Sequence, residues 1–183
     1  MVKLQPLLFS FTLFTGLALA PGAFADVSAY IYIPDIPGES NVSQKEGWID
    51  LASFHYPVIR EESAQVGRGR ARGRAEVGPV MMGKWADSAS VYINLATLQG
   101  KVFDEVIVEI YQDSGETRHL QFRYTFRNVT FTSYTSEMAT GGERVHETFG
   151  MTFEELRVLY IELDDDHSAG DEHEIEYDIA AGV

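Results

Sequence analysis

Residues 120–127 alternate strictly between apolar and polar side chains, and this pattern restricts the fold more than any other feature. The apolar positions are Leu120, Phe122, Tyr124 and Phe126, and the polar positions are Gln121, Arg123, Thr125 and Arg127. Successive side chains of a strand point to opposite faces, so the segment predicts a strand with one buried face and one solvated face. The apolar positions then become odd at Val129 and Phe131, which predicts a β-bulge near Arg127 and Asn128.

Further strands are predicted on both sides of this segment, because runs of β-branched and aromatic residues are bounded there by turn residues. These runs are residues 29–33, 48–55, 77–85, 103–111, 149–153 and 158–163. Pro79 indicates an edge strand or a bulge in its run. Asp113-Ser114-Gly115 predicts a hairpin turn before the alternating strand.

One helix is predicted before Gly100, with Asp87 or Ser88 as the N-terminal cap. Val91, Leu95 and Leu98 follow the i, i+4, i+7 spacing and are expected on one face. About eight strands and one helix predict a mainly β chain, either an antiparallel β-barrel or a two-sheet sandwich, with one flanking α-helix.

The two ends of the chain are expected to lie outside this domain, which is assigned to residues 26–163. Residues 1–25 resemble a secretory signal peptide: Lys3 precedes a short apolar run, and Ala-Phe-Ala at 23–25 is a signal peptidase site. An uncleaved membrane anchor is the alternative, although the run is short for a bilayer span. We therefore expect a mature chain that begins at Asp26, is periplasmic or secreted, and has no membrane contact after cleavage.

The C-terminal segment, residues 164–183, is rich in acidic side chains and is expected to be a solvated extension that the fold does not need. An alternative is a strand, because residues 174–177 alternate with period two. Asp164, Asp165, Asp166, His167, Asp171 and His173 also suggest a calcium site, but their spacing does not fit an EF-hand loop.

Composition and motifs argue against most enzymatic chemistry. The chain has 183 residues, no cysteine and a net charge of −14, which excludes disulfides and thiolate sites and disfavours nucleic acid as a general partner. It contains no nucleophile elbow, zinc-protease motif, P-loop or dinucleotide fingerprint. His55, His119 and His146 are interpreted as structural residues of strands. We therefore expect no enzyme activity, no catalytic residue, no cofactor and no bound metal.

The loop at residues 61–74 is unusually basic for such an acidic chain. It carries Arg68, Arg70, Arg72 and Arg74, separated by glycine and alanine. A charged cluster of this kind favours an electrostatic contact, and the most abundant acidic surface is another copy of the protein. These four residues are the candidate self-assembly loop. A bare exposed loop and a nucleic-acid contact are the alternatives.

A set of motifs occurs in a fixed order from residue 29 to residue 93. They are Ala-Tyr-Ile-Tyr-Ile at 29–33, Ile-Pro-Gly-Glu-Ser at 36–40, Gly-Trp-Ile-Asp-Leu-Ala-Ser-Phe at 47–54, and the residues Lys84, Asp87, Ala89, Ser90 and Ile93. In this order they resemble the Hcp family, the tube proteins of type VI secretion systems. The resemblance extends over roughly residues 29–160.

This resemblance implies a two-sheet β-barrel with one helix, hexameric rings that stack into a tube, and spike or effector proteins as partners. It also implies a structural role without a catalytic residue. The signal peptide, the arginine loop and the acidic tail are not core features of the family. The alternatives are an exported monomeric binding module unrelated to a secretion apparatus, and a secreted hydrolase with an unrecognised site.

Overall fold

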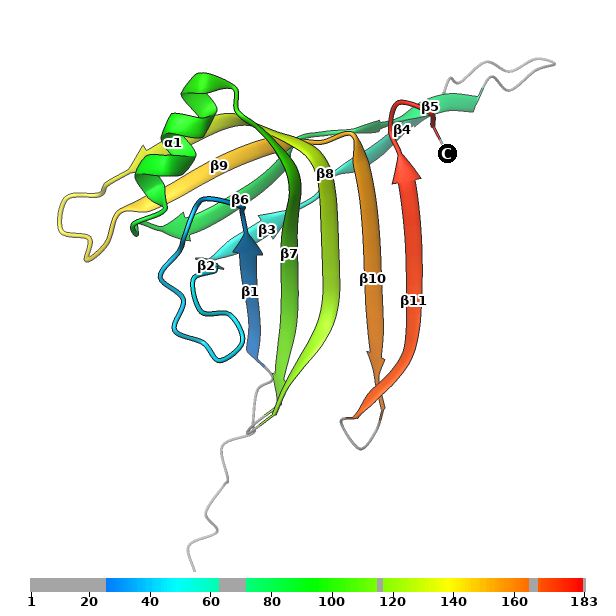
Figure 1. Cartoon of the computed structure of the whole chain (residues 1–183), viewed down its shortest axis with the longest axis horizontal. Helices are drawn as coiled ribbons and strands as arrows, with labels where there is room; N and C mark the ends of the chain where they lie inside the picture. The colour runs from blue at the N-terminus through cyan, green and yellow to red at the C-terminus, as the bar shows by residue number, and fades with distance from the viewer. Residues whose placement is uncertain (1–25, 63–71, 115–116, 165–167, 183) are drawn as a thin grey trace, which may run out of the picture.

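Antiparallel strands make up most of the computed structural model, which describes residues 26–62, 72–114, 117–164 and 168–182 (Figure 1). In chain order the elements are β1 Asp26–Tyr32, β2 Ile49–Leu51, β3 Ser53–His55, β4 Val58–Glu62, β5 Arg72–Val77, β6 Val80–Trp85, α1 Ser90–Gln99, β7 Val102–Ser114, β8 Thr117–Glu137, β9 His146–Thr152, β10 Glu155–Leu163 and β11 Ala169–Asp178. The predicted fold class, mainly β with one helix, is confirmed.

The main sheet closes on itself as a barrel. Its strand order is β2-β1-β7-β8-β9-β6-β3. β2 and β3 are two halves of one extended segment, residues 49–55, which is interrupted at Ala52. The first half pairs with β1 and the second half pairs with β6. The N–H of Ala52 donates to the carbonyl of Gly83 at 2.7 Å, so the break in the path is itself hydrogen-bonded. Closure removes two sheet edges that would otherwise be open to other chains.

The predicted strand at 77–85 is divided in the structure. Val77 ends β5 and Val80 begins β6, so Pro79 lies between two strands and not within one. β6 lies in the interior of the sheet, between β9 and β3, and the edge-strand interpretation is therefore wrong. β4 and β5 form a separate two-stranded arm that extends away from the barrel (Figure 1).

β8 is long enough to belong to two regions. Its first half pairs with β10 and its second half with β9, while β10 carries β11 on its other side. β10 and β11 thereby extend the sheet beside the barrel (Figure 1). The interpretation of the C-terminal segment as a solvated extension is corrected here: Ala169–Asp178 is a paired strand, as its period-two pattern indicated. Pairing with β10 satisfies the backbone groups on one side of this strand, while most of its acidic side chains remain exposed.

The buried side chains of β8 change from even to odd positions near Arg127 and Asn128, as predicted, but no β-bulge causes this change. Both side chains are exposed, and Asn128 has a φ of 51°. The β7–β8 register does not shift there, since Phe103 faces Val129 and Glu105 faces Arg127. β7 changes face at the same level, so the two strands bend together. The register shifts of β8 lie elsewhere, opposite Ile110 in β7 and at Phe131.

The core lies inside the barrel and beneath α1. Its buried residues include Ile31, Ile49, Met82, Val106, Val108, Phe126, Phe131, Phe149 and Met151. The helix buries Ser90, Ile93 and Ala96. The predicted stripe of Val91, Leu95 and Leu98 is real, but it is exposed. Ile93 fills the core beneath the helix beside the small side chains of Ser90 and Ala96, while the stripe lies on the outer side.

The predicted C-terminal end of the helix is confirmed, but the predicted cap at Asp87 or Ser88 is wrong, because the N-cap residue is Ala89 and no side chain forms a capping hydrogen bond. Asp87 Oδ1 accepts a hydrogen bond from the N–H of Ala89 at 2.9 Å, just before the helix. Gly100 ends it in the left-handed conformation, with φ 61°, and its N–H bonds to helix carbonyls. Glu39 also reaches this region, because its Oε1 accepts from the N–H of Ser88 at 2.9 Å. The Ile-Pro-Gly-Glu-Ser motif therefore ties the first loop to the start of the helix.

Candidate assembly surfaces

A buried carboxylate on β7 anchors the first loop to the sheet. Glu109 accepts hydrogen bonds from Lys45, from the hydroxyl of Tyr111 at 2.7 Å and from Nε of Arg123 at 2.7 Å. Lys45 also lies over the ring of Trp48, 3.7 Å from its centroid. Burial would raise the pKa of Glu109, but these donors lower it below its ordinary value. The carboxylate is therefore held ionised as a structural group.

A second buried cluster joins the helix start to β6 and β9. Lys84 Nζ lies 2.8 Å from both Glu147 Oε2 and Asp87 Oδ1, and it donates to Ser90 Oγ at 3.0 Å. The hydroxyl of Tyr134 donates to Glu147 Oε1 at 2.7 Å. Burial works to raise the pKa of Glu147, and the donors lower it; the pKa of Tyr134 rises to about 12, through burial and this bond. Three of the family-motif residues, Lys84, Asp87 and Ser90, thus have a structural role.

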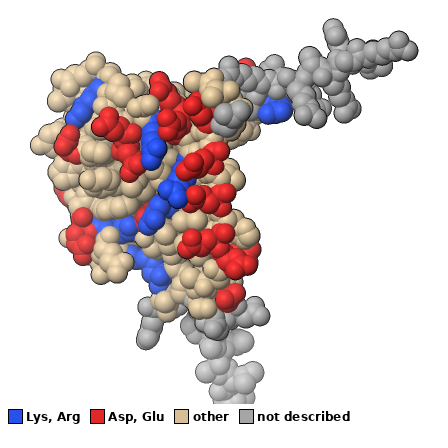
Figure 2. Space-filling view, turned by 45° about the vertical axis from the view of Figure 1, so that its right-hand side comes forward, with Lys and Arg blue, Asp and Glu red and all other residues tan. Residues whose placement is uncertain are grey.

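Ion pairs cross the exposed face of β7, β8, β10 and β11. The pairs are Glu105–Arg127 at 3.6 Å, Arg127–Glu155 at 3.6 Å, Arg157–Glu174 at 2.6 Å and Arg157–Glu176 at 3.6 Å. Figure 2 shows basic side chains crossing this face with acidic side chains beside them. Exposed pairs of this kind contribute about 0–1 kcal/mol each. Their main effect is to make the face polar and locally charge-balanced.

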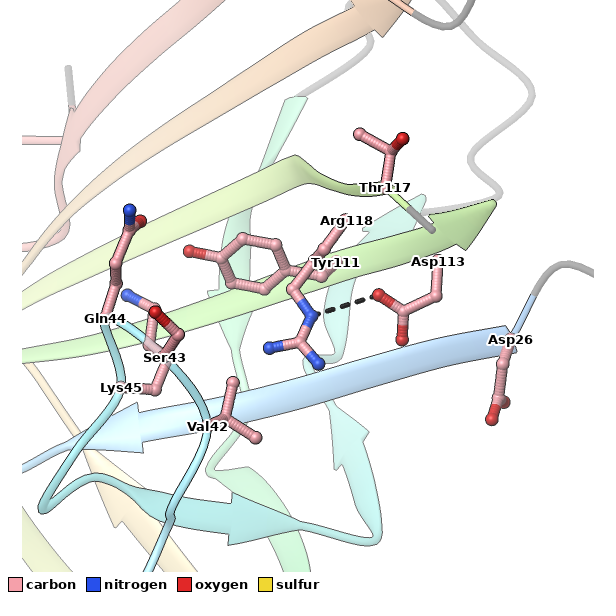
Figure 3. A pocket seen from close by; sticks show the side chains of 9 residues that line it. All are labelled: Asp26, Val42, Ser43, Gln44, Lys45, Tyr111, Asp113, Thr117 and Arg118. Carbon is pink, nitrogen blue, oxygen red and sulfur yellow. Dashed lines mark hydrogen bonds and ion pairs between the residues drawn. The ribbon is translucent and has the colours of Figure 1, made fainter. Parts of the chain in front are cut away.

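One pocket of about 660 Å³ opens where the first loop passes the ends of β1 and β7 (Figure 3). It is lined by Asp26, Val42, Ser43, Gln44, Lys45, Tyr111, Asp113, Thr117 and Arg118. Arg118 Nε lies 3.0 Å from Asp113 Oδ1, and Lys45 is paired with Glu109. The positive groups in the pocket wall are therefore already matched by carboxylates of the protein.

The three strand histidines lie on three different strands. His55 ends β3 and is exposed, whereas His146 on β9 packs edge-on against Trp85 with 5.3 Å between ring centroids. Nε2 of His119 on β8 is buried without a hydrogen-bond partner among the described residues. Within the described ranges, no group of three or more metal-ligating side chains is placed to hold an ion. The suggested calcium cluster lies partly outside these ranges.

The candidate self-assembly loop is only partly within the described structure. Arg68 and Arg70 lie outside the described residues, while Arg72 and Arg74 are on β5. Arg72 and Arg74 therefore belong to the projecting arm and not to the barrel wall. The exposed apolar side chains of β4, Val58 and Ile59, were not predicted, because two adjacent apolar residues form no periodic pattern. No helix in the described part of the chain has the length and hydrophobicity to cross a bilayer.

Comparison with known proteins gives consistent matches along the barrel. A family model described as "Type VI secretion system effector, Hcp" matches residues 30–160. A solved structure of a type six secretion system protein has 27% sequence identity and a TM-score of 0.81, covering 86% of this chain and 99% of that chain. No curated protein sequence matches the chain.

Two more distant structures share the fold. Hcp1 from Salmonella typhimurium has 18% identity and a TM-score of 0.67, covering 85% of this chain and 96% of that chain. A type VI secretion system effector from Yersinia pestis has 19% identity and a TM-score of 0.64, covering 82% of this chain and 98% of that chain. The common architecture is thus the barrel with its flanking helix.

Proposed function

This chain belongs to the Hcp family of type VI secretion proteins, and from that membership we propose that it is a structural protein that assembles into rings of six subunits. The observation that carries the proposal is the family match over residues 30–160, together with a structural match that spans nearly all of a related secretion protein. The family resemblance supplies the number six. The same resemblance supports stacking of the rings into a tube, with spike or effector proteins as further partners.

The charge of the chain means that assembly needs specific contacts. A net charge of −14 makes copies repel one another over about one Debye length, roughly 10 Å at 0.1 M salt. Local pairing of arginine with carboxylate offsets this repulsion, and arginine fixes orientation through bidentate contacts. The four arginines of the 61–74 loop are suited to this role, and two of them, Arg72 and Arg74, belong to β5 of the arm that extends away from the barrel. In a closed ring, every subunit uses the same pair of surfaces.

Export through a signal peptide is the second part of the proposal. Asp26, the residue expected to start the mature chain, pairs with Asp113 of β7. Cleavage before Asp26 would therefore keep every described residue of β1. The intact mass of protein recovered from the periplasm or the medium tests this proposal. A mass that begins at Met1 would overturn it and favour the membrane-anchor alternative.

Multi-angle light scattering of the mature protein tests the assembly. We expect a particle of six subunit masses at tens of micromolar, with ring-shaped projections in negative-stain images. A monomer under these conditions would overturn the ring and favour the exported monomeric binding module. Electron microscopy of concentrated protein then distinguishes single rings from stacked tubes.

A further inference from the structure

Trp85 is one of the two tryptophans of the chain, and it lies exposed at the end of β6. Its exposed fraction is 43%, although tryptophan is on average one of the more buried residue types. The other tryptophan, Trp48, is covered by Lys45 and Tyr32, whose charge and ring lie 3.7 Å and 5.5 Å from its centroid. An exposed indole is typical of a surface that binds a ligand, because tryptophan supplies much binding energy.

Trp85 forms part of the wall of a pocket of about 570 Å³. Glu137 of β8 and Trp85 of β6 both lie opposite His146 of β9, so the three side chains form a row across the outer face of these strands. The loop between β8 and β9 forms the other wall, and the N–H of Ala86 ties it to the end of β6 by donating to the carbonyl of Val145 at 3.0 Å. The size of the pocket suits a small organic ligand.

The charged side chains of this pocket are not matched to one another. Glu137, Glu143 and Arg144 are exposed, and none of them forms an ion pair with a described residue. The guanidinium carbon of Arg144 lies 5.5 Å from the centroid of the Trp85 ring, and His146 packs on the same ring edge-on. Hydrogen-bond donors and acceptors of both charges thus surround an apolar ring.

This mixture of charges favours a neutral ligand. Arg144 lies near the indole and would repel a ligand cation there, whereas Glu137 and Glu143 would repel an anion. A neutral ligand with an apolar face and a polar edge avoids both repulsions. A pyranose sugar has this form, since its axial C–H groups make a flat apolar face that can pack on an indole, while its hydroxyl groups point outward at the edge.

We propose that the pocket binds a neutral saccharide, with one sugar ring packed on Trp85. The carboxylates of Glu137 and Glu143 accept hydrogen bonds from its hydroxyl groups, and the guanidinium of Arg144 donates to them. The exposed side chain of Met138 adds apolar contact at the rim. This binding site goes beyond the proposed assembly and requires no contact between copies.

Tryptophan fluorescence tests the site, because Trp48→Phe leaves Trp85 as the only tryptophan. Tri-N-acetylchitotriose and maltotriose are the probes, and they distinguish an amino-sugar glycan from a glucose-based one. We expect at least one of them to change the emission saturably, with a dissociation constant below about 10 mM. Calorimetry of the wild-type protein with the same probes provides a second readout. No binding of either sugar in both measurements would overturn the proposal.

Variants and competing ligands locate the contact. Trp85→Ala should weaken sugar binding at least about ten-fold, whereas Tyr92→Ala, which removes an aromatic side chain that is 49% exposed on α1, should leave it unchanged. Equal losses in the two variants would overturn the site. Binding of tetramethylammonium chloride but of neither sugar would show a cation site instead. Acrylamide should quench Trp85 in assembled Trp48→Phe protein, and a shielded indole would show that another copy covers the pocket and would also overturn the proposal.

Discussion

Lys84 and Glu147 form an ion pair inside the barrel wall, with 2.8 Å between Nζ and Oε2 and side-chain exposures of 0% and 3%. Lys84 comes from β6 and Glu147 from β9, while Asp87 and Ser90 add contacts from the start of α1. The pair therefore fixes the helix to two neighbouring strands. A buried pair adds little net stability compared with an apolar pair, but losing one partner is costly.

Replacing the lysine alone is expected to be strongly destabilising. Lys84→Met should lower the free energy of unfolding by about 3–5 kcal/mol, since it leaves the carboxylate of Glu147 buried without its cation. Urea denaturation followed by circular dichroism measures this loss. The double variant Lys84→Met/Glu147→Leu should recover most of it. A loss below about 1 kcal/mol for Lys84→Met would contradict the structural role assigned to the pair.

Acid stability is expected to depend on Glu109. The pKa of Glu109 is lower in the folded protein than in the unfolded chain. Its contribution to the free energy of unfolding is therefore fully present above the unfolded pKa of about 4.3, and it is lost as the pH falls through the lower folded pKa. Glu109→Gln should therefore reduce stability at pH 7 and flatten its dependence on pH below about 4.3. Denaturation at a series of pH values measures both effects. Glu46→Gln, an exposed site, is the control, and equal acid profiles for the two variants would refute this role.

Two glycines of the first loop should respond differently to alanine. A Cβ at Gly38 would lie 2.1 Å from the carbonyl oxygen of Trp48, so Gly38→Ala forces the backbone to move. Gly47 has open space around it but a φ of 79°. Gly47→Ala should cost about 1–2 kcal/mol, the usual penalty of the left-handed conformation, and Gly38→Ala distinctly more. The melting temperatures of the two variants test this prediction. A larger loss of stability for Gly47→Ala than for Gly38→Ala would show that the loop adapts around residue 38.

Removing the C-terminal strand is expected to destabilise the fold. Deletion from Asp164 onward exposes one side of β10, and Tyr177, which is half-buried opposite Leu156, is lost. Full burial of a large apolar side chain contributes about 1.5–3 kcal/mol, and half-buried Tyr177 contributes about half of that, so the melting temperature should fall by roughly 2–6 °C. Tyr177→Ala should account for more of the loss than Ile175→Ala, because Ile175 is 63% exposed. An unchanged melting temperature would restore the interpretation of this segment as dispensable.

The arginines of the 61–74 loop are expected to support assembly without stabilising the monomer. Changing Arg68, Arg70, Arg72 and Arg74 to serine should shift the assembly toward smaller species in light scattering. The melting temperature of the monomeric fraction should change little, because the described core of the barrel includes none of the four arginines. Charge-preserving substitution of the same residues by lysine should retain part of the assembly. An equally hexameric serine variant would show that the loop is not the electrostatic contact.

The strands of the barrel could be predicted from the sequence because each carries a local pattern, such as the alternation at 120–127. The outcome for α1 shows the limit of such patterns. The spacing of Val91, Leu95 and Leu98 places them on one face, but it does not say whether that face meets the protein's own sheet or another surface. The C-terminal strand has the same ambiguity, since acidic composition and period-two alternation gave opposite predictions. The structure shows a strand, because β10 lies beside this segment and pairs with it.

The buried ionic clusters could not be predicted for a related reason. Lys45 and Glu109 are 64 residues apart, and Lys84 and Glu147 are 63 apart. No local spacing connects such partners, because the closure of the sheet brings them together. The family motif did include Lys84 and Ser90, yet a motif alone does not distinguish a structural charge from a functional one.

The bend that β7 and β8 share at Glu105 and Arg127 limits how this gene can change in length. Because both strands change face at the same level, their pairing continues across the bend without a shift. Deleting one residue from either strand would place the two bends at different heights in the sheet. A deletion in β8 would turn Val129 and Phe131 from the core toward water, and a deletion in β7 would do the same to Phe103. Insertions and deletions in this region should therefore be tolerated only in compensating pairs, one in each strand.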